Sequence, residues 1–527
     1  MKPYFLLAAV LVFAAGCKKA GPEVAPPVEP AGGPQQIPFV LEVKYPPLFQ
    51  EYEDGTVGEI ELPFHEKDQL VVTGEGISGI LQYDRFYVFP GAVSFSGYLT
   101  YQGPGNPPAD LVLQVRRINP SLSHDGTARP YPVFTQNSDQ RDELGTIFAS
   151  ARDAAQRYGV YTGTCTFGTP SVELSVATSF LLTRLIFSAF LPSEHHQKKV
   201  SLTNGDETYG PFDVQITSQS AEIVWAIPEG MELIRPMLEV EGVARFPVVP
   251  KGRQFTEEPF VFETGSYNED VIWLYDLSTE SVHTEYTTTV VYQSKPGPTG
   301  HTVSAGGYTD FLFLSHLNVE SEFVALSLSR HLTVWVDGEC RFLSRRDEAI
   351  YASWPHLMGD GTLYARSLDE EDGSAGICIS GSSNDPAEFV IGGDVSVVAQ
   401  GAAGGAGIGT GWIAPSTYNW DRYDFGNIRI NTTGTVKATG GAGAAGIGSG
   451  AFQNKGVVQV IVGNIIVSGG TVDARGGGGE GVSDIGIDAD ALLLGEVFVD
   501  PKVTWDGVHG YHVARTDDGV PIGYDKD

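Results

Sequence analysis

Three stretches in the last third of the chain decide the fold: GGDVSVVAQGAAGGAGIGTG at 392–411, TTGTVKATGGAGAAGIGSG at 432–450 and SGGTVDARGGGGEGVSDIG at 468–486. Their central isoleucines recur after 39 and then 38 residues; these are Ile408, Ile447 and Ile485. A fixed period of this length is typical of supersecondary units that stack on one another. The sequence therefore predicts a repeat architecture in this region.

Each unit has the same internal order. A β-branched strand (VSVV, TVKA or TVDA) leads to a corner of Gly and Ala and then to a short strand around the isoleucine. Small residues permit positive φ and close backbone approach at the corner, while Val and Ile point inward. We expect a right-handed parallel β-helix over 310–510, followed by a tail at 511–527. The alternative is Gly-rich disorder, against which the interleaved Val and Ile argue.

The N-terminus is typical of a bacterial lipoprotein. Residues 1–16 contain a basic start, an apolar run and a small-residue site, and Cys17 follows directly. A plain secretory signal is the alternative, but it needs no Cys at this position, whereas diacylglycerol attachment does. We therefore expect lipid on Cys17 and a Pro-rich spacer over 17–37. The expected location is the outer membrane at the cell surface, with a periplasm-facing orientation as the alternative.

Charge and cysteine content restrict the partners and the cross-links. The chain has 33 basic and 65 acidic side chains and a net charge of −32, which argues against nucleic acid and other polyanionic partners. After Cys17 only Cys165, Cys340 and Cys378 remain, so at most one intramolecular pair can form. Stacked units could bring two of them together, and we predict a Cys340–Cys378 disulfide. The alternative is two inert core thiols.

Residues 38–250 have the pattern of a β-sandwich. Short alternating or β-branched runs are separated by turn residues throughout this region. One segment differs, because apolar residues from Leu144 to Tyr158 recur at helical spacing and predict a single helix. Residues 251–309 are expected to form a β-rich connector to the repeats. The predicted fold class is thus mostly β.

Several strings in this region carry a family resemblance. EKDQLVV, SFSGYL, SFLLTRLIFSAF and VSLTNGD follow the lipoprotein Cys and the spacer in that order. This order resembles the fimbrillin-type (type V pilin) lipoproteins of Gram-negative anaerobes. The resemblance implies two transthyretin-like β-sandwiches and fimbrial partners. Polymerising members are cleaved after an Arg, but the first Arg after Cys17 is Arg85, inside the strand region. We therefore do not expect an Arg-processed pilin.

The C-terminal half carries a second resemblance. FLFLSHLNVES, RHLTVWVDGECRFL, AIYASW and GTLYARSLDEEDGSAGICIS precede the Gly-rich units in order. Together they are similar to the GAGIG-repeat modules of bacterial surface proteins, over roughly 310–481. The resemblance implies a repetitive surface module of unsettled ligand, not an enzyme.

Catalytic motifs are absent from the sequence. It contains no H-E-x-x-H, G-x-S-x-G or P-loop string, and we expect no catalytic residues, metal or cofactor. The alternative is a β-helix polysaccharide lyase or hydrolase with paired carboxylates from neighbouring coils. The acids available for such pairs are Asp421, Asp424, Asp484, Asp488 and Asp490. A purely structural surface stalk is a second alternative.

One segment combines rings with polar groups. Residues 412–425 hold several aromatic side chains beside Asn, Asp and Arg; the candidate ligand platform is Trp412, Tyr418, Trp420 and Tyr423. Aromatic faces suit stacking on sugar rings, whose hydroxyls bond to neighbouring polar groups. The alternative is that these rings cover the edge of the repeats. The expected function is an adhesin-like or fimbria-associated protein with a glycan or host-surface ligand.

Overall fold

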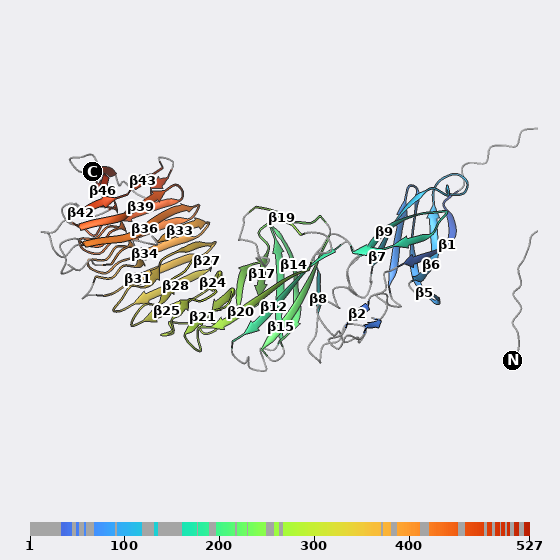
Figure 1. The fold of residues 1–527 in the computed structure, drawn as a ribbon, viewed down its shortest axis with the longest axis horizontal. Helices are drawn as coiled ribbons and strands as arrows, with labels where there is room; N and C mark the ends of the chain where they lie inside the picture. The colour runs from blue at the N-terminus through green and yellow to red at the C-terminus, as the bar shows by residue number, and fades with distance from the viewer. Residues whose placement is uncertain are drawn as a thin grey trace, which may run out of the picture. The chain divides into compact units, whose positions relative to one another are not determined.

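The computed structural model describes residues 33–44, 49–51, 57–59, 68–89, 92–118, 131–134, 161–176, 178–188, 197–216, 219–228, 230–248, 258–262, 267–369, 373–380, 387–411, 421–451, 459–478, 482–486, 491–495, 497–500, 503–505, 511–515 and 521–526. These residues form strands and no helix, which confirms the mostly β class (Figure 1). The helix predicted from Leu144 to Tyr158 lies outside the described residues, as do Cys17 and the spacer up to 32. No described segment forms a helix with the length and apolarity of a membrane span.

The chain divides into two compact units. One comprises 1–46, 70–115 and 163–173, and the other comprises 47–69, 116–162 and 174–527. Residues 174–250 therefore belong with the C-terminal repeats. The expected sandwich region, residues 38–250, thus contributes to both units.

The first unit is built on an eight-stranded sheet in the order β10-β1-β6-β5-β4-β7-β9-β11. Alternate residues of β1 are buried, so Phe39, Leu41 and Val43 face a core that also contains Leu81 and Phe95. The strands are β1 (Gln35–Lys44), β4 (Gln69–Gly74), β5 (Ile77–Phe89), β6 (Ala92–Tyr101), β7 (Val112–Ile118), β9 (Tyr161–Thr166), β10 (Ser171–Glu173) and β11 (Ser175–Val176).

The second unit starts with strands from two sheets that share one core. This two-sheet region comprises β8 (Tyr131–Phe134), β12 (Thr178–Phe187), β13 (Gln197–Asn204), β14 (Glu207–Gln215), β15 (Ser220–Pro228), β17 (Met237–Val240) and β18 (Ala244–Pro247). Its core includes the fully buried Trp225, Leu238 and Phe246. Two short pairs accompany it: β2 (Phe49–Glu51) with β3 (Val57–Glu59), and β16 (Glu232–Leu233) with β19 (Phe260–Val261).

The rest of the second unit is a stack of strands in three sheets, which pair in parallel except for the last two strands of the chain. The thirteen-stranded sheet runs from the two-sheet region into β20 (Tyr267–Asp276), β22 (Thr288–Tyr292), β24 (Phe311–Ser315), β27 (Leu332–Asp337), β30 (Pro355–Gly359), β33 (Glu388–Gly393), β36 (Asp421–Thr432), β39 (Gln459–Val467), β42 (Ala491–Leu494) and β43 (Val497–Val499). Since β20 already pairs in parallel with β22, the stack begins before the boundary predicted at 310.

The other two sheets supply the remaining strands of each turn that the chain makes around the stack. We call one such turn a coil. The seven-stranded sheet contains β25 (Asn318–Ser321), β28 (Glu339–Ser344), β31 (Thr362–Ser367), β34 (Ser396–Gln400), β37 (Thr435–Thr439), β40 (Thr471–Arg475) and β44 (Thr504–Trp505). The ten-stranded sheet contains β21 (Val282–Thr284), β23 (Val303–Ala305), β26 (Leu326–Leu328), β29 (Ile350–Ala352), β32 (Ile377–Ile379), β35 (Ile408–Gly409), β38 (Ile447–Gly448), β41 (Ile485–Gly486), β45 (Tyr511–Arg515) and β46 (Pro521–Lys526).

The register of the Gly-rich units is as the sequence predicts. Ile408 pairs with Ile447, and Ile447 pairs with Ile485, so the isoleucines stack in successive coils. All three are fully buried in one continuous apolar core. Glycine is required beside them, because a Cβ on Gly448, whose φ is +134°, would lie 1.7 Å from the carbonyl oxygen of Gly486.

The outer face of the first coils is covered by the two-sheet region. Phe313, Trp335 and Met358 point away from the stack interior and belong to the core of that region. The rings of Phe246 and Phe313 lie 5.8 Å apart. At the edge, Arg245 Nη1 pairs with Asp360 Oδ2 at 3.2 Å. One face of the thirteen-stranded sheet thus packs into the core of the stack, and its other face packs into the core of the two-sheet region.

Candidate functional site

The predicted ligand platform lies largely outside the described residues. Trp412, Tyr418 and Trp420 are not described, and of Tyr423 only the backbone in β36 is described. The strands on either side still place the segment in the topology. Residues 410–420 connect β35 to β36, from the ten-stranded to the thirteen-stranded sheet.

The same corner is described in four earlier coils. Its connections are residues 285–287, 306–310, 329–331 and 353–354, each of which joins a strand of the ten-stranded sheet to one of the thirteen-stranded sheet. Each connection carries one ring, and we call these four residues the aromatic corner: Tyr286, Tyr308, His331 and Trp354. Neighbouring strands in a sheet lie about 4.8 Å apart, so the corner presents rings in a row along the stack.

These rings are placed to meet a ligand. The side chain of Tyr308 is 81% exposed and that of Tyr286 is 40% exposed. Tyr286 stacks on Trp273, with ring centroids 3.8 Å apart and an interplanar angle of 7°. His331 and Trp354 form a tilted pair at 5.4 Å. The corner therefore offers both open ring faces and rings that are held in place by a neighbour.

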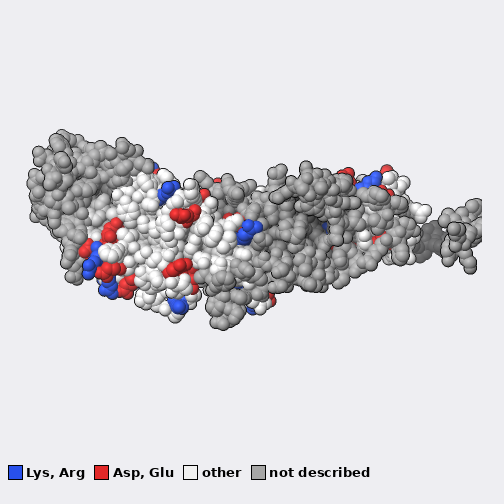
Figure 2. Space-filling view, turned by 60° about the horizontal axis from the view of Figure 1, so that its bottom comes forward, with Lys and Arg blue, Asp and Glu red and all other residues white. Residues whose placement is uncertain are grey.

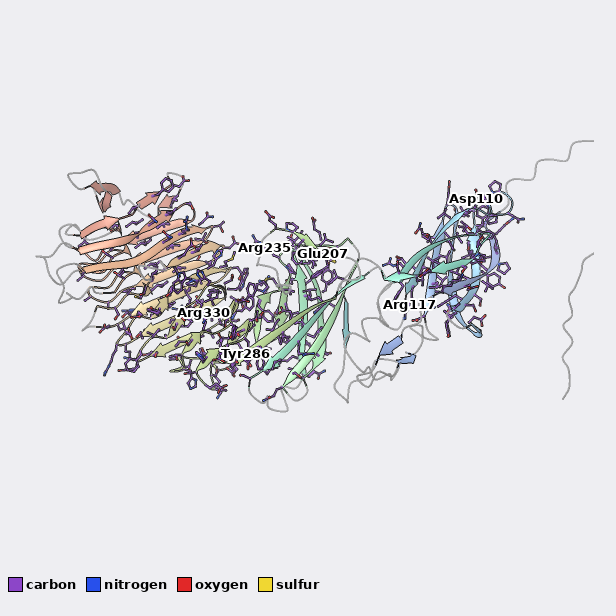
Figure 3. The ribbon with its side chains drawn as sticks, viewed as in Figure 1. Asp110, Arg117, Glu207, Arg235, Tyr286 and Arg330 are labelled. Atoms are coloured by element: carbon purple, nitrogen blue, oxygen red, sulfur yellow. The ribbon has the colours of Figure 1, made fainter. Side chains whose placement is uncertain are left out.

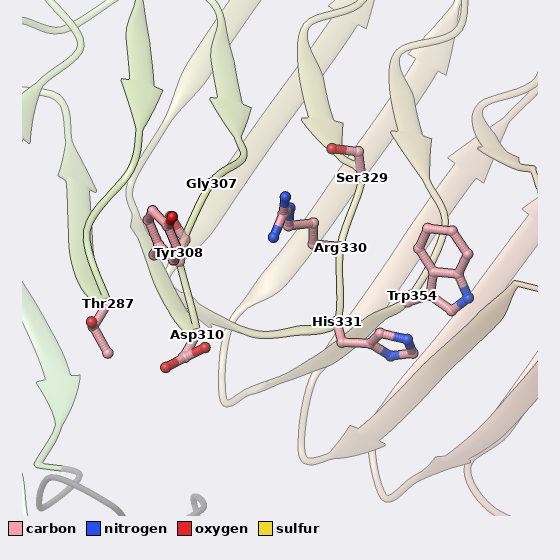
Figure 4. A pocket seen from close by; sticks show the side chains of 9 residues that line it. Thr287, Gly307, Tyr308, Asp310, Ser329, Arg330, His331 and Trp354 are labelled. Carbon is pink, nitrogen blue, oxygen red and sulfur yellow. The ribbon is translucent and has the colours of Figure 1, made fainter. Parts of the chain in front are cut away.

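A groove of about 560 Å³ runs along this corner. It extends over consecutive coils, and its lining residues are Thr287, Gly307, Tyr308, Thr309, Asp310, Ser329, Arg330, His331 and Trp354 (Figure 4). Tyr286 and Arg330 both project from the first part of the stack (Figure 3). From the coil of Thr287 to that of Trp354 there are three strand spacings, or about 14 Å. A ligand of several rings can lie along this length.

Hydrogen bonds between coils hold the backbone of the groove. The backbone N–H of Asp310 donates to Thr287 O at 3.0 Å, and that of Thr333 donates to Asp310 O at 2.8 Å. Beneath them the hydroxyls of Thr284 and Thr309 are buried and 2.7 Å apart. Short connections with such bonds lose little conformational freedom on binding. The groove is thus largely preformed.

Two charged side chains of opposite sign line the groove, Asp310 and Arg330. No described carboxylate forms an ion pair with Arg330, although most described arginines of the second unit have one. The paired arginines are Arg117 with Asp68, Arg235 with Asp394, Arg245 with Asp360, Arg341 with Glu339, Arg345 with Glu320, Arg346 with Glu322, Arg429 with Glu388 and Arg475 with Asp473. Figure 2 shows basic and acidic side chains side by side at the left of a largely uncharged described surface.

The sequence-based prediction missed the aromatic corner, although a signal for it exists. The rings at 286, 308, 331 and 354 recur at intervals of 22, 23 and 23 residues, each after a short β-branched or apolar strand. Aromatic density within one contiguous segment pointed instead to 412–425. Residues 410–420 join the same two sheets as the four connections of the aromatic corner do.

The predicted Cys340–Cys378 disulfide is not formed in this structure, which has both residues as free thiols. Cys340 points into the core from β28 and pairs in register with Leu363, 23 residues later. Cys378 lies in another sheet, between the buried Ile377 and Ile379, and so points away from the core. Coils here are shorter than 38 residues, so this spacing does not superpose the two positions. Cys165 is also a buried free thiol.

Burial dominates the chemistry of these thiols and of the nearest carboxyl. It raises the pKa of Cys340 and of Cys378 to about 12, the latter with a further contribution from the charge of Glu348. Burial, together with Asp347 and Asp369, raises the pKa of Glu348 to about 8. Thiols with such pKa values are poor nucleophiles at neutral pH.

The acids named for an enzymatic alternative do not form a described pair. Asp484 is buried and its Oδ1 accepts a 2.7 Å bond from Gly476 N, which is a turn-stabilising role. Asp421 and Asp424 are described only in their backbone, and Asp488 and Asp490 lie outside the described residues. Among described residues, no group of three His, Cys, Asp or Glu side chains is placed to hold a metal ion.

Comparisons with known proteins give weak structural matches. No family model and no curated protein matches the chain. A candidate cell adhesion protein from Bacteroides ovatus is 11% identical over 44% of this chain and 91% of its own, with a TM-score of 0.20. The tip fimbrial protein Mfa3 from Porphyromonas gingivalis is 8% identical over 42% and 84%, with a TM-score of 0.19.

A third match is the major pilin protein T-13 from Streptococcus pyogenes. It is 8% identical over 46% of this chain and 97% of its own, with a TM-score of 0.14. TM-scores this low transfer neither a fold nor an activity. The function is therefore inferred from the chain's own residues.

Proposed function

We propose that the protein is an extracytoplasmic, adhesin-like lipoprotein that binds a glycan at the aromatic corner. The observation that carries the proposal is the row of rings at the same corner of four consecutive coils, beside a groove lined by hydroxyl and charged groups. In this proposal the stack is a right-handed parallel β-helix that serves as a rigid scaffold. Ligand-contacting residues commonly lie on connections held by such scaffolds.

The chemistry of the groove favours a sugar over an apolar ligand. The face of a sugar ring carries C–H groups that pack on an aromatic face, while its hydroxyls need hydrogen-bond partners. Tyr308 and Trp354 supply aromatic surface, and Thr287, Asp310 and Ser329 supply donors and acceptors. In an extended saccharide successive rings repeat at a distance comparable to the strand spacing, so one sugar can meet one coil.

Binding is favoured over hydrolysis by the composition of the groove. Glycosidases use two carboxyl groups on either side of the scissile bond. Asp310 is the one carboxylate among the described lining residues. A purely structural stalk, in turn, has no need for a preformed groove with exposed rings.

The segment 412–425 extends the same proposal. Residues 410–420 connect β35 to β36, two coils beyond the described 353–354 connection, and the segment supplies Trp412, Tyr418, Trp420 and Tyr423. We infer that it lengthens the binding surface along the stack. Several weak ring contacts, each contributing about 0.5–1.5 kcal/mol beyond area burial, then act on one extended ligand.

The cellular setting is inferred from the sequence. The small-residue site before Cys17 and the spacer after it support a lipid anchor in the outer membrane, with the body at the cell surface. The strings in 38–250 that resemble fimbrillin-type lipoproteins support fimbrial partners. Protease shaving of intact cells distinguishes the surface orientation from a periplasm-facing one.

A glycan array with ring variants tests the function. We expect Tyr308→Ala with Trp354→Ala to abolish retention of the protein on its glycan, because both rings line the groove. Phe323→Ala is the matched control, since Phe323 is 62% exposed and lies on the stack away from the groove. Its binding should be unchanged. Equal retention of the double variant and the control, at unchanged thermal stability, would refute the proposal.

A further inference from the structure

The charge distribution in the groove indicates which glycans it can take, if the proposed glycan binding holds. Arg330 is exposed, lines the groove and forms no ion pair with any described carboxylate. Among the described exposed arginines most have a carboxylate partner, so the guanidinium of Arg330 is available to an acidic ligand in the groove. In Figure 4 the side chain of Arg330 extends from its connection toward Tyr308.

We propose that the groove binds a saccharide with one carboxylated sugar, whose carboxylate pairs with Arg330. The planar guanidinium can donate two parallel N–H bonds to a carboxylate, and such charge-assisted pairs are about twice as strong as neutral hydrogen bonds. The adjoining neutral sugars lie on Tyr308 and Trp354. Ser329, next to Arg330, and Thr287 face their hydroxyls.

The same charges exclude a polyanionic glycan. The net charge of −32 repels a chain of repeated acidic groups. The single arginine that lines the groove can pair with only one of those groups. Asp310 opposes a second carboxylate on the neighbouring sugar, because like charges at close range disfavour the wrong ligand. The specificity is therefore for an isolated acidic sugar, terminal or internal, in an otherwise neutral chain.

Short-range recognition of this kind has a defined salt dependence. The attraction between Arg330 and a carboxylate is screened as ionic strength rises, since the Debye length falls from about 10 Å at 0.1 M to about 3 Å at 1 M salt. Stacking on Tyr308 and Trp354 is not screened in this way. We expect salt to weaken binding of the acidic glycan and to leave its neutral counterpart unaffected.

The experiment uses the full-length protein on an array of neutral, monosialylated, uronic acid-containing, sulfated and heparan sulfate glycans. A retained acidic glycan is then compared with its carboxyl-reduced derivative in solution. We expect Arg330→Gln to bind the acidic form roughly tenfold more weakly and the reduced form about as well as wild type does. Arg366→Gln is the matched control, because Arg366 is an exposed arginine on β31, in the seven-stranded sheet.

The outcomes separate the two proposals. Retention of neutral glycans alone, lost in the Tyr308→Ala and Trp354→Ala variant, supports glycan binding and overturns the acidic specificity. Preferential retention of heparan sulfate or other sulfated glycans also overturns it, as does an Arg330→Gln variant that binds the acidic and reduced forms like wild type. If no glycan is retained, both proposals fail. Arg330→Lys should recover part of the binding, because lysine keeps the positive charge but cannot donate two parallel N–H bonds to one carboxylate.

Discussion

Asp270 offers a quantitative test of the structure at the point where the two-sheet region meets the parallel stack. Its carboxyl is 7% exposed in β20, between β12 and β22 of the same sheet. Among the described residues its side-chain partner is Thr288, whose hydroxyl donates to Asp270 Oδ1 at 3.5 Å. Burial outweighs this bond and one from the backbone of Val271, and raises the pKa of Asp270 from 3.8 to about 7.

The raised pKa of Asp270 determines how the stability of the fold changes with pH. A raised pKa means that the folded state holds the proton more tightly than the unfolded state does, so the contribution to stability is complete below pH 3.8. It is lost as pH rises through about 7. A difference of about three pH units in pKa corresponds to roughly 4 kcal/mol. Asp270→Asn removes the ionisation, so the variant should gain up to roughly 4 kcal/mol over wild type between pH 4.5 and 8.5.

Urea unfolding followed by tryptophan fluorescence measures this difference, because all seven tryptophans belong to the second unit. Asp276→Asn is the matched control at the end of the same strand. Burial alone would raise the pKa of Asp276, but hydrogen bonds from Ser294 and Ser278 outweigh it and lower the pKa. That variant should be less stable than wild type by a constant amount over the same range. If the difference in free energy of unfolding between Asp270→Asn and wild type did not change with pH, the burial of the Asp270 carboxyl would be refuted.

Three further predictions concern the core, the thiols and the anchor. Ile447→Ala should destabilise the second unit by about 2–5 kcal/mol in urea unfolding, because the side chain is fully buried between Ile408 and Ile485; a loss below 1 kcal/mol would contradict the stacked register. Cys340 should react with a thiol reagent only after unfolding, since burial raises its pKa to about 12, and a disulfide found by mass spectrometry would show this to be wrong. Cys17→Ser should abolish fatty-acid labelling and release the protein from membranes, and labelling that persists would exclude lipid at this position.

The parallel stacking could be predicted because its signal is local and repeated. Val and Ile recur with the same neighbours in each Gly-rich unit, and Gly and Ala at the corners leave room for the next coil. Those constraints determine the register of Ile408, Ile447 and Ile485 without knowledge of the rest of the chain. The mostly β class follows in the same way from alternation along strands such as β1.

The continuity of the thirteen-stranded sheet could not be predicted. Residues 180–187 of β12 pair in parallel with residues 267–274 of β20, far along the chain, and no motif links the two segments. The parallel pairing of β20 with β22 therefore lies N-terminal to the boundary expected at 310. The 38-residue period of the last coils does not apply between Cys340 and Cys378, so it does not superpose these two residues.

The aromatic corner was hidden by its distribution over four connections of different length. Tyr286, Tyr308, His331 and Trp354 are each an isolated ring in sequence, and the strands before them are only three residues long. They become a group only when the coils are superposed. A contiguous cluster such as 412–425 can be found in the sequence without superposing the coils, so sequence patterns point to it and not to the aromatic corner.

The shared sheet also determines how the proposed adhesin would respond to mechanical tension. In the second unit a pull on a ligand in the groove passes through β30, β27, β24, β22 and β20 to β12 by hydrogen-bonded strand pairs, with no flexible linker in that path. Coils from β33 onward lie outside this route. They can unzip or be trimmed from the far end without breaking this path. A ligand in the groove would then lose any contacts with 412–425 but stay attached, so the tensile strength of the groove itself depends on the first coils.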